Sequence, residues 1–576
     1  MTIPAEFSRE LGARGSRREV ACADPAAELT PTAAAVVAAI PAWWSSRARA
    51  AGLDGDWLDV ERAIDALPPC PVPKRPPLEE TWGDVTGEEV GQAYVSALSS
   101  ATRARHGRHY TPAELAESLW AMAREALGHR AQSQPLDGLV RDPACGAGAL
   151  LLPVLREHLR ASRHVEPRLV LAHLPTVIEG WDLDPAGVWI ANVILAAELL
   201  HLQATIPESG RRPLPALARV GDGLAAGRPP ARVMILNPPY GRVHLSQSDK
   251  ERFADVLYGH ANLYAVFMAA AEEQVDDRGV VAALVPTSWT AGRYFAPLRQ
   301  RLSEAVRLAS IRFVEDRSGV FTGVLQETCL AVFTRRRVRR TQVSSTAQGN
   351  VMPVARIPTP TGTDPWLLPR RSNLAGVAAG AGQLTASLGS LGWKVSTGPL
   401  VWNRRQGDLG DTPHESSVPV VWSNDLDGGV IHRDSRRDDK RFLQIVSDKD
   451  RAVMALSEPA ILIQRTAAPE SPRKLVAAHL DADRLASAGG AVVVENHVNV
   501  LRPTTSQIPS ALMARVLSTS TLDAVVRCVS GSVALSAYEL MALPMPDEAT
   551  ILEWHGLDDD QLERAVATAY TPGGRP

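Results

Sequence analysis

Apolar runs alternate with amphipathic segments through the middle of the chain. Short apolar runs end at Asp142, Trp181 and Leu236, and a longer segment with helical apolar spacing follows each of them. Strands that alternate with helices in this way predict an α/β domain with a mostly parallel, doubly wound sheet. Three further apolar runs cover residues 280–285, 310–314 and 327–333. The last two are close enough in sequence to form an antiparallel hairpin at one edge of the sheet.

Changes in composition divide the chain into five parts. Residues 1–87 are rich in alanine and arginine, and they contain six prolines between residues 67 and 77, which cannot continue a helix or a central strand. Residues 344–388 are rich in Ser, Thr, Pro, Gly and Ala, which is typical of a linker. Short β-like runs separated by turn residues follow this stretch. We predict an N-terminal extension (1–87), an α/β domain (88–343), a linker (344–388), a second domain (389–549) and a C-terminal helix with a tail (550–576).

The tetrapeptide Asn237-Pro238-Pro239-Tyr240 interrupts the apolar run that ends at Leu236. Two prolines cannot continue a sheet ladder, so an amide, rigid carbonyls and an aromatic ring are predicted at the carboxyl end of a strand. Ligands bind at this end of the strands in open α/β sheets. The tetrapeptide alone is equally compatible with a simple tight turn.

Three acidic residues follow other predicted strands. Asp142 begins the turn Asp-Pro-Ala-Cys-Gly-Ala-Gly148, whose glycines allow a ligand to approach the backbone, although the turn lacks the GxGxxG spacing of a dinucleotide site. Asp182 is placed to accept hydrogen bonds from both hydroxyls of a ribose, and Asp222 from an adenine amino group. Asp184 can cap the helix that follows it. Each acid alone is compatible with a turn or cap, but their order at successive strand ends favours a nucleoside pocket.

One loop before the first predicted strand enters a helix. In Gly-Arg-His-Tyr110-Thr111-Pro112, the threonine hydroxyl is expected to cap the helix and the proline to occupy its first turn. Glu114 then lies near the positive end of the helix.

The order of these motifs over residues 88–335 resembles the gamma-class DNA adenine-N6 methyltransferases of type II restriction-modification systems, of the TaqI type. The resemblance implies a Rossmann-like class I methyltransferase domain with a mostly parallel seven-stranded sheet and an antiparallel edge hairpin. It also implies that S-adenosyl-L-methionine is the cofactor. The implied cofactor-binding residues are Tyr110, Thr111, Pro112, Asp142, Pro143, Ala144, Cys145, Gly146, Gly148, Asp182, Asp222, Asn237 and Pro239.

The chemistry of an exocyclic amine explains the strand-end motif. The nitrogen is a poor nucleophile because its lone pair is delocalised into the ring. The Asn237 side-chain oxygen and the Pro238 carbonyl can accept its two hydrogens and aim the lone pair at the methyl group, so no strong base is required. The target base must be swung out of the duplex and stacked. Tyr240 is the first expected ring, and the resemblance implies Phe321 as the second, although Phe321 is also compatible with an ordinary core residue.

Residues 389–549 resemble the target-recognition domain of the same enzymes, including those of the PstI/BsuBI kind, and we expect a mixed α+β fold. Lysines and arginines make this part locally basic, which suits contacts with DNA phosphates and base edges. Any single arginine among them is more often an ordinary surface residue than a base reader. The candidate DNA-binding residues are Arg404, Arg405, Arg436, Arg437, Arg465, Arg473 and Lys474.

The remaining composition adds little about function. The net charge of −3 gives no sign that the chain as a whole binds nucleic acid. The five cysteines lack CxxC spacing, so they predict neither disulfides nor a zinc site. We expect a cytoplasmic monomer without a membrane span, which acts on double-stranded DNA alongside a separately encoded restriction endonuclease.

Three other functions remain open at this stage. Enzymes that methylate a release-factor glutamine or an RNA base also hold a planar amino group, but they need no large C-terminal DNA-reading domain. A non-catalytic DNA-binding protein is the second alternative. A fused nuclease is the third, although residues 1–87 contain no clear Asp...Glu-x-Lys set.

Overall fold

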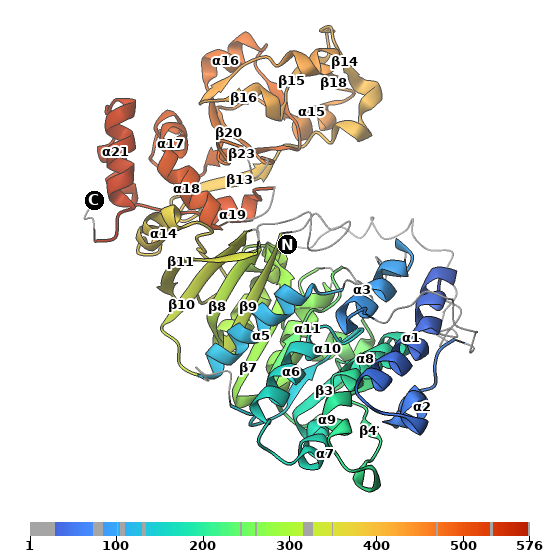
Figure 1. Ribbon diagram of the computed structural model, residues 1–576. Coiled ribbons are helices and arrows are strands. Elements are labelled where there is room, and N and C mark those ends of the chain that lie inside the picture. The colour runs from blue at the N-terminus through green and yellow to red at the C-terminus, as the bar shows by residue number, and fades with distance from the viewer. Residues whose placement is uncertain are drawn as a thin grey trace.

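The computed structural model describes residues 29–72, 84–100, 102–103, 110–128, 134–241, 245–259, 262–314, 327–347, 349–467, 471–529 and 534–573. Figure 1 shows two parts, with the C-terminal one lying above the sheet of the other. We call them the large-sheet domain (residues 29–358) and the C-terminal domain (residues 372–573). None of the helices in the described ranges combines the length and apolar character needed to cross a membrane.

Nine strands form the sheet of the large-sheet domain. Their order is β11 (Asn350–Pro358), β10 (Arg340–Ala347), β8 (Arg307–Val314), β9 (Thr328–Thr334), β7 (Val275–Pro286), β6 (Ala231–Leu236), β2 (Val140–Asp142), β3 (Ile178–Asp182) and β5 (Ala218–Val220). The five strands from β7 to β5 are parallel, and β9 is antiparallel to both of its neighbours. The mostly parallel α/β architecture is thus as predicted.

The expected count of seven strands and the expected linker are both wrong. Strands β10 and β11 come from residues 340–358, so the start of the predicted linker 344–388 extends the sheet. The pair β8 and β9 is antiparallel as predicted but does not form the edge, because β10 lies beside β8. Val343 and Ile357 of the two added strands are buried in the apolar core, and Val354 and Ala355 pack against it. Val351 and Met352 of β11 are exposed, so the apolar residues of these strands do not follow a simple buried pattern.

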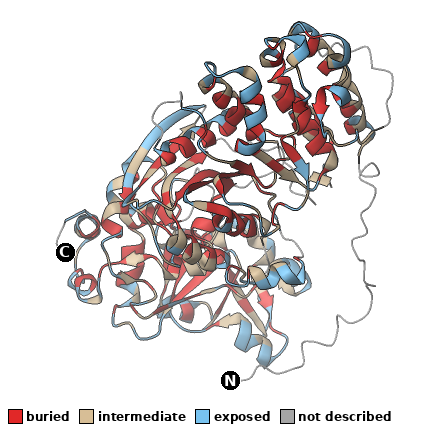
Figure 2. Cartoon of the chain, turned by 90° about the horizontal axis from the view of Figure 1, so that it is seen from below, coloured by how far each residue is buried: buried red, intermediate tan, exposed pale blue. Residues whose placement is uncertain are grey.

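Alternate side chains of the strands enter two apolar cores, one on each face of the sheet. Val233 and Ile235 of β6 enter the first, and Met234 and Leu236 the second. Figure 2 shows how burial concentrates along the strands and on the helix surfaces that face them. The first core is covered by α1 (Pro31–Ala50), α3 (Gly87–Ala97), α5 (Ala113–Leu127), α6 (Leu151–Ala161), α7 (Pro167–Val177) and α8 (Pro185–Ala197), and the second by α11 (Leu263–Gln274) and α12 (Ala296–Ala305). Shorter helices are α2 (Val60–Ala63), α9 (Leu200–Ala204) and α10 (Gln247–Arg252).

Helix α1 is an integral part of the large-sheet domain and not an appendage. Trp43 and Trp44 are buried in the same core as α3 and α8. Their indole nitrogens donate hydrogen bonds to the carbonyls of Val85 (2.7 Å) and Trp57 (2.9 Å). The predicted boundary at residue 87 therefore does not separate two cores.

The C-terminal domain combines two main sheets with helices. One sheet has the order β13 (Trp393–Thr397), β23 (Val498–Pro503), β20 (Ala460–Gln464), β21 (Ala477–Leu480). The other has the order β14 (Leu409–Gly410), β18 (Phe442–Gln444), β15 (Ser417–Val421), β22 (Val492–Val494), β19 (Ala455–Leu456). Two further pairs of short strands are β12 (Ala386–Ser387) with β24 (Pro544–Met545) and β16 (Leu426–Asp427) with β17 (Val430–Ile431). The helices are α14 (Ala375–Ala381), α15 (Asp448–Met454), α16 (Ala482–Ser487), α17 (Ser510–Leu517), α18 (Ser520–Val529), α19 (Ala537–Met541), α20 (Glu548–Glu553) and α21 (Asp559–Ala569). Helices α14, α20 and α21 share a core with β13, so this domain extends beyond the predicted limits 389–549.

A buried guanidinium joins the two domains. The Arg299 side chain donates to the carbonyls of Trp289 (2.8 Å) and Gly292 (2.9 Å) in the large-sheet domain. It also donates to the Thr363 carbonyl (3.1 Å) in the connecting segment and to the Tyr538 hydroxyl (3.1 Å) on α19. Because a buried cation must have its donors satisfied, these contacts hold the connecting segment and α19 against the loop after β7.

Trp44→Ala tests whether α1 belongs to the core. Replacing a fully buried tryptophan by alanine leaves a cavity, so we expect the free energy of unfolding to fall by about 3–5 kcal/mol. Chemical denaturation followed by circular dichroism would measure the change. Arg49→Ala, on the exposed side of the same helix, is expected to change it by less than about 0.5 kcal/mol. Equal stability of the two variants would contradict the shared core.

Candidate active site

A cavity of about 270 Å³ lies at the carboxyl ends of β2, β3, β5 and β6. Acidic residues and an amide line it together with apolar side chains. Eleven of the predicted cofactor-binding residues line this cavity: Tyr110, Thr111, Asp142, Pro143, Ala144, Cys145, Gly146, Asp182, Asp222, Asn237 and Pro239. Residues that follow successive strands in the sequence thus lie together around one cavity.

Asp142 ends β2 and is almost completely buried. One carboxyl oxygen accepts a hydrogen bond from the Ala144 amide at 3.0 Å. Burial, with a smaller contribution from the nearby Asp182 carboxylate, raises the pKa of Asp142 to about 8. The carboxyl is therefore largely protonated at neutral pH in the ligand-free protein.

Asp182 connects the glycine turn to the end of β3. Its two carboxylate oxygens accept hydrogen bonds from the amides of Gly146 and Asp184, both at 2.8 Å. The Asp184 side chain accepts from the Ala186 amide (3.1 Å) and from the Tyr94 hydroxyl (2.7 Å). Asp184 is thus the cap of α8, as the alternative interpretation of the sequence held, and Asp182 lines the cavity.

The loop after β5 packs closely against the loop after β2. A Cβ atom on Gly223 would lie 1.7 Å from the Pro143 carbonyl oxygen, so only glycine fits there. The Asp222 side chain accepts from the Leu224 amide at 2.9 Å. Arg228 donates to the Asp222 carbonyl at 2.6 Å while its guanidinium lies 4.0 Å from the Trp181 ring. These contacts hold Asp222 at the cavity wall.

Asn237 follows β6, and two hydroxyls orient its side chain. Its amide nitrogen donates to the Thr111 hydroxyl (2.9 Å), and its oxygen accepts from the Tyr240 hydroxyl (3.0 Å). Thr111 therefore binds Asn237 and does not cap α5, where Pro112 occupies the N-cap position without a side-chain hydrogen bond. In the described part of the chain, the Pro238 carbonyl accepts no hydrogen bond.

Tyr240 is held from two sides. Its hydroxyl also lies 3.2 Å from the Leu284 carbonyl, and its ring meets Tyr264 edge-on at 6.2 Å. Tyr264 in turn contacts the Ser288 hydroxyl (2.8 Å) and stacks on Phe295 (5.1 Å). Burial raises the pKa of Tyr240 well above its ordinary value, so the phenol remains a neutral donor.

Some predicted residues lie elsewhere, and other residues line the cavity unpredicted. Gly148 does not line it but packs on α8, where a Cβ atom would lie 3.2 Å from the Ala191 side chain. Phe321 lies outside the described residues. Tyr94, Leu183 and Phe267 line the cavity although no strand-end pattern marks them. Leu183 is 70% exposed, and its place in the sequence between Asp182 and Asp184, directly after a predicted strand, was the available signal.

Most of the candidate DNA-binding side chains are engaged within the protein. Arg405 pairs with Asp408 and Asp450, Arg436 with Asp434, and Arg437 lies over the rings of Trp402 and Trp422. Arg465 and Arg473 donate to the carbonyls of Asn496 and Thr519. Arg404 remains exposed and makes no ion pair or hydrogen bond through its side chain to any described residue.

Lys474 does not lie on the exposed surface that its predicted role in DNA binding would favour. Its side chain is only 8% exposed and lies near Arg370 and Glu327, at the junction of the domains. Burial lowers the pKa of Lys474 to about 8. A lysine in this environment cannot reach a phosphate without leaving the junction.

The ionisation of Asp142 predicts a dependence of stability on pH. Because the folded state raises its pKa to about 8, the folded protein keeps a proton that the unfolded chain releases above about pH 4. Stability should therefore fall as pH rises from 4 to 8, by at most about 1.36 kcal/mol per pH unit, and level off above 8. Asp142→Asn should lack this contribution and be more stable than wild type near pH 8. If the free energies of unfolding of the two proteins changed with pH in the same way over this range, the assigned role of Asp142 would be contradicted.

Comparison with known proteins identifies relatives of the chain. Residues 232–321 match the Eco57I restriction-modification methylase family. The type II methyltransferase M.PstI of Providencia stuartii is 26% identical over 329 residues, which are 54% of this chain and 64% of that protein. M.BsuBI of Bacillus subtilis, also a type II methyltransferase, is 23% identical over 332 residues, which are 55% of this chain and 66% of that protein. The matched region thus spans slightly less than two thirds of each relative.

One solved structure resembles most of the chain. The type IIL restriction-modification enzyme MmeI, determined in complex with DNA, has a TM-score of 0.52 and 13% identity, and the match covers 86% of this chain and 80% of that one. At this identity the similarity concerns the fold alone. Residues 232–321 thus match an Eco57I-type restriction-modification methylase domain, and the chain is similar in sequence to two type II methyltransferases.

Proposed function

We propose that this protein transfers a methyl group from S-adenosyl-L-methionine to the N6 amino group of an adenine in a specific double-stranded DNA sequence, within a restriction-modification system. The orientation of Asn237 carries the proposal. Its amide is held by Thr111 and Tyr240 beside the cavity whose walls contain Asp142, Asp182 and Asp222. A planar amide held in one orientation is suited to grip another planar amino group.

The cavity suits a nucleoside cofactor that carries positive charge. The Asp182 carboxylate, which lines the cavity, is suited to accept the ribose hydroxyl hydrogens, and Asp222 is suited to accept from the adenine amino group. The hydroxyl of Tyr110, which lines the cavity, is buried without a hydrogen-bond partner among the described residues, so a polar group of the ligand can satisfy it. When bound, the cofactor supplies a methyl group activated by a positive sulfur. The protein then has to position the reactants and polarise the amine.

Two acceptors at the strand end would activate the target amine. An amide oxygen has two lone pairs, and the Asn237 oxygen uses one of them for the Tyr240 hydroxyl. The second lone pair and the Pro238 carbonyl can accept the two hydrogens of the adenine amino group. This grip favours a pyramidal nitrogen whose lone pair points at the methyl group. Once the methyl–sulfur bond has broken and the methyl group is attached to the nitrogen, the amine passes its extra proton to solvent water.

The flipped base needs stacking as well as hydrogen bonds. Tyr240 is the proposed ring, and its contacts with Tyr264 and with the Leu284 carbonyl set its orientation. Phe321 stays a predicted second ring. The C-terminal domain would select the DNA sequence, and a separate endonuclease with the same target would complete the system.

One experiment separates the proposed activity from its alternatives. The purified protein would be incubated with S-adenosyl-L-methionine carrying a labelled methyl group and with duplex DNA, structured RNA or release factor. We expect label in DNA, and digestion to nucleosides should yield N6-methyladenine. Label in RNA or protein alone would overturn the proposal, and label in cytosine would correct the target base.

Asn237→Ala should remove methyl transfer and leave cofactor binding nearly intact. The substitution deletes one acceptor of the proposed grip, and loss of a comparable preorganised hydrogen-bonding group costs about 10²–10³-fold in kcat. Single-turnover transfer and calorimetric cofactor binding would separate the two effects. Asn373→Ala, which removes an exposed asparagine in the C-terminal domain, is the matched control. Turnover close to that of wild type in Asn237→Ala would rule out the grip.

Asp182→Ala should instead weaken cofactor binding. The carboxylate would lose its hydrogen bonds to the ribose, and hydrogen bonds to a charged group contribute about 1.5–3 kcal/mol each. We expect the Kd to rise at least about tenfold by titration calorimetry. Asp483→Ala, at an exposed position on α16, serves as the control. An unchanged Kd would remove Asp182 from the cofactor site.

A further inference from the structure

Two segments of the C-terminal domain run side by side and form one surface. Leu400 and Glu495 make a parallel β-bridge. The Asn496 amide donates to the Leu400 carbonyl (2.9 Å), and the Leu400 amide donates to the Val494 carbonyl (3.2 Å). The loop 401–406 therefore begins beside the turn that connects β22 and β23. We call these two segments the reading edge.

Aromatic packing anchors the start of the loop. The Arg437 guanidinium lies 5.5 Å from the Trp402 ring and 4.9 Å from the Trp422 ring. The Lys440 ammonium lies 5.2 Å from the Trp402 ring. Cations over aromatic faces attract the rings, so Trp402 is held between its neighbours and the core of the domain.

An ion-pair cluster anchors the loop three residues later. The Arg405 guanidinium binds both oxygens of Asp450 (2.9 and 3.0 Å) and also pairs with Asp408. Asn403 and Arg404 lie between the two anchored side chains, at the end of the short 3-10 helix Trp402–Arg404. Both are exposed, and neither side chain makes an ion pair or hydrogen bond with a described residue. The loop thus presents an amide and a guanidinium on a rigid support.

A buried carboxylate orients a third polar group on the same edge. Glu495, whose side chain is 2% exposed, accepts a hydrogen bond from His497 Nδ1 (2.6 Å) and another from the His497 amide (2.9 Å). The His497 side chain is 48% exposed. Because Nδ1 is bound to the glutamate, the ring is held with its Nε2 edge toward solvent.

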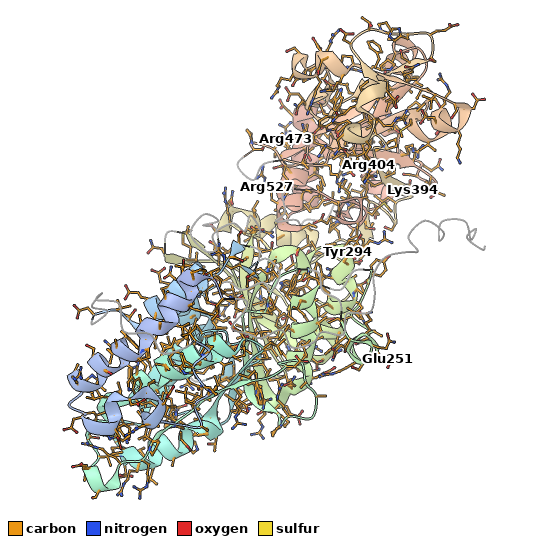
Figure 3. All side chains as sticks on the ribbon, turned by 90° about the vertical axis from the view of Figure 1, so that its right-hand side faces the viewer. Glu251, Tyr294, Lys394, Arg404, Arg473 and Arg527 are labelled. Carbon is orange, nitrogen blue, oxygen red and sulfur yellow. The ribbon has the colours of Figure 1, made fainter. Side chains whose placement is uncertain are left out.

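The strands behind the reading edge carry unbalanced positive charge. Lys394 of β13 lies directly opposite Arg502 of β23 in the antiparallel ladder. Like charges at such positions repel each other, and neither residue pairs with an acid among the described residues. A phosphate group would relieve this repulsion. Figure 3 shows Arg404 and Lys394 in the part of the C-terminal domain that is nearest the large-sheet domain.

We propose that Asn403, Arg404 and His497 read base edges in the major groove of double-stranded DNA, while Lys394 and Arg502 hold the adjacent backbone. The chemistry matches because an arginine fork pairs with guanine O6 and N7, and an asparagine amide pairs with adenine N6 and N7. Sites that discriminate between bases need side chains held by their neighbours, which the two anchors and Glu495 provide. The inference rests on the proposed function and names the residues that choose the sequence.

The test uses the full-length protein and a library of duplexes with a randomised segment. Both bound and methylated duplexes are sequenced, so that sequence preference is measured with and without transfer. Arg404→Ala, Asn403→Ala and His497→Ala should each relax the preference at one base position. We expect discrimination there to fall roughly 5- to 150-fold while the rest of the motif stays unchanged. Arg564→Ala, which removes an exposed arginine on α21, should retain the wild-type motif.

Two outcomes would overturn the inference. An unchanged motif in all three variants would show that the reading edge does not contact bases. Uniform weakening across all sequences, with a salt dependence reduced by about one charge in Arg404→Ala, would make these residues phosphate contacts only. The same experiment detects failure of the proposed function separately. A wild-type protein that binds a defined motif but does not methylate adenine would contradict that function. The bound duplexes would still show whether the reading edge contacts bases.

Discussion

The parallel pairing of β6, β2, β3 and β5 is the constraint on which the cavity depends. Parallel strands bring their carboxyl ends to one edge, and each loop that leaves this edge must then find a partner for its backbone. The loops satisfy one another: Asp182 binds the Gly146 amide, and Gly223 lies against the Pro143 carbonyl. The cavity is therefore built from bonds between loops and not from any single motif.

The two domains depend on a different kind of contact. Arg299 is buried and forms no ion pair with a carboxylate of the described residues, and carbonyl and hydroxyl oxygens from both domains accept hydrogen bonds from it. An arginine bound in this way needs every one of these oxygens in place, because a lost acceptor would leave a buried N–H group unsatisfied. The loop after β7, which also approaches Tyr264 through Ser288, is thus tied to the position of α19. Movement of one domain against the other would disturb both ends of this link.

The sequence was most informative where local chemistry and position in the chain agree. The prolines after Leu236 and the acids at the ends of β2 and β3 and just after β5 marked strand ends correctly, because the end of a strand and its burial both depend on local sequence. Contacts between distant residues could not be predicted. Thr111 looked like a helix cap, yet its partner Asn237 lies 126 residues away. Lys474 looked like a surface residue, but it is buried, with Arg370 of the connecting segment and Glu327 of the large-sheet domain nearby.

Long separation in sequence has a further consequence for helix α1. Trp43 and Trp44 are among the first described residues, but α8, against which the helix packs, ends at Ala197. A ribosome that adds about 5–20 residues per second needs on the order of ten seconds to make the intervening chain. During that time α3 and the segment 55–63 can pack against α1, but the apolar surface of α8 is still missing, so the two adjacent indoles are incompletely covered. Newly made chains are therefore expected to be most prone to aggregation, and most dependent on chaperones, before the third strand of the sheet has been synthesised.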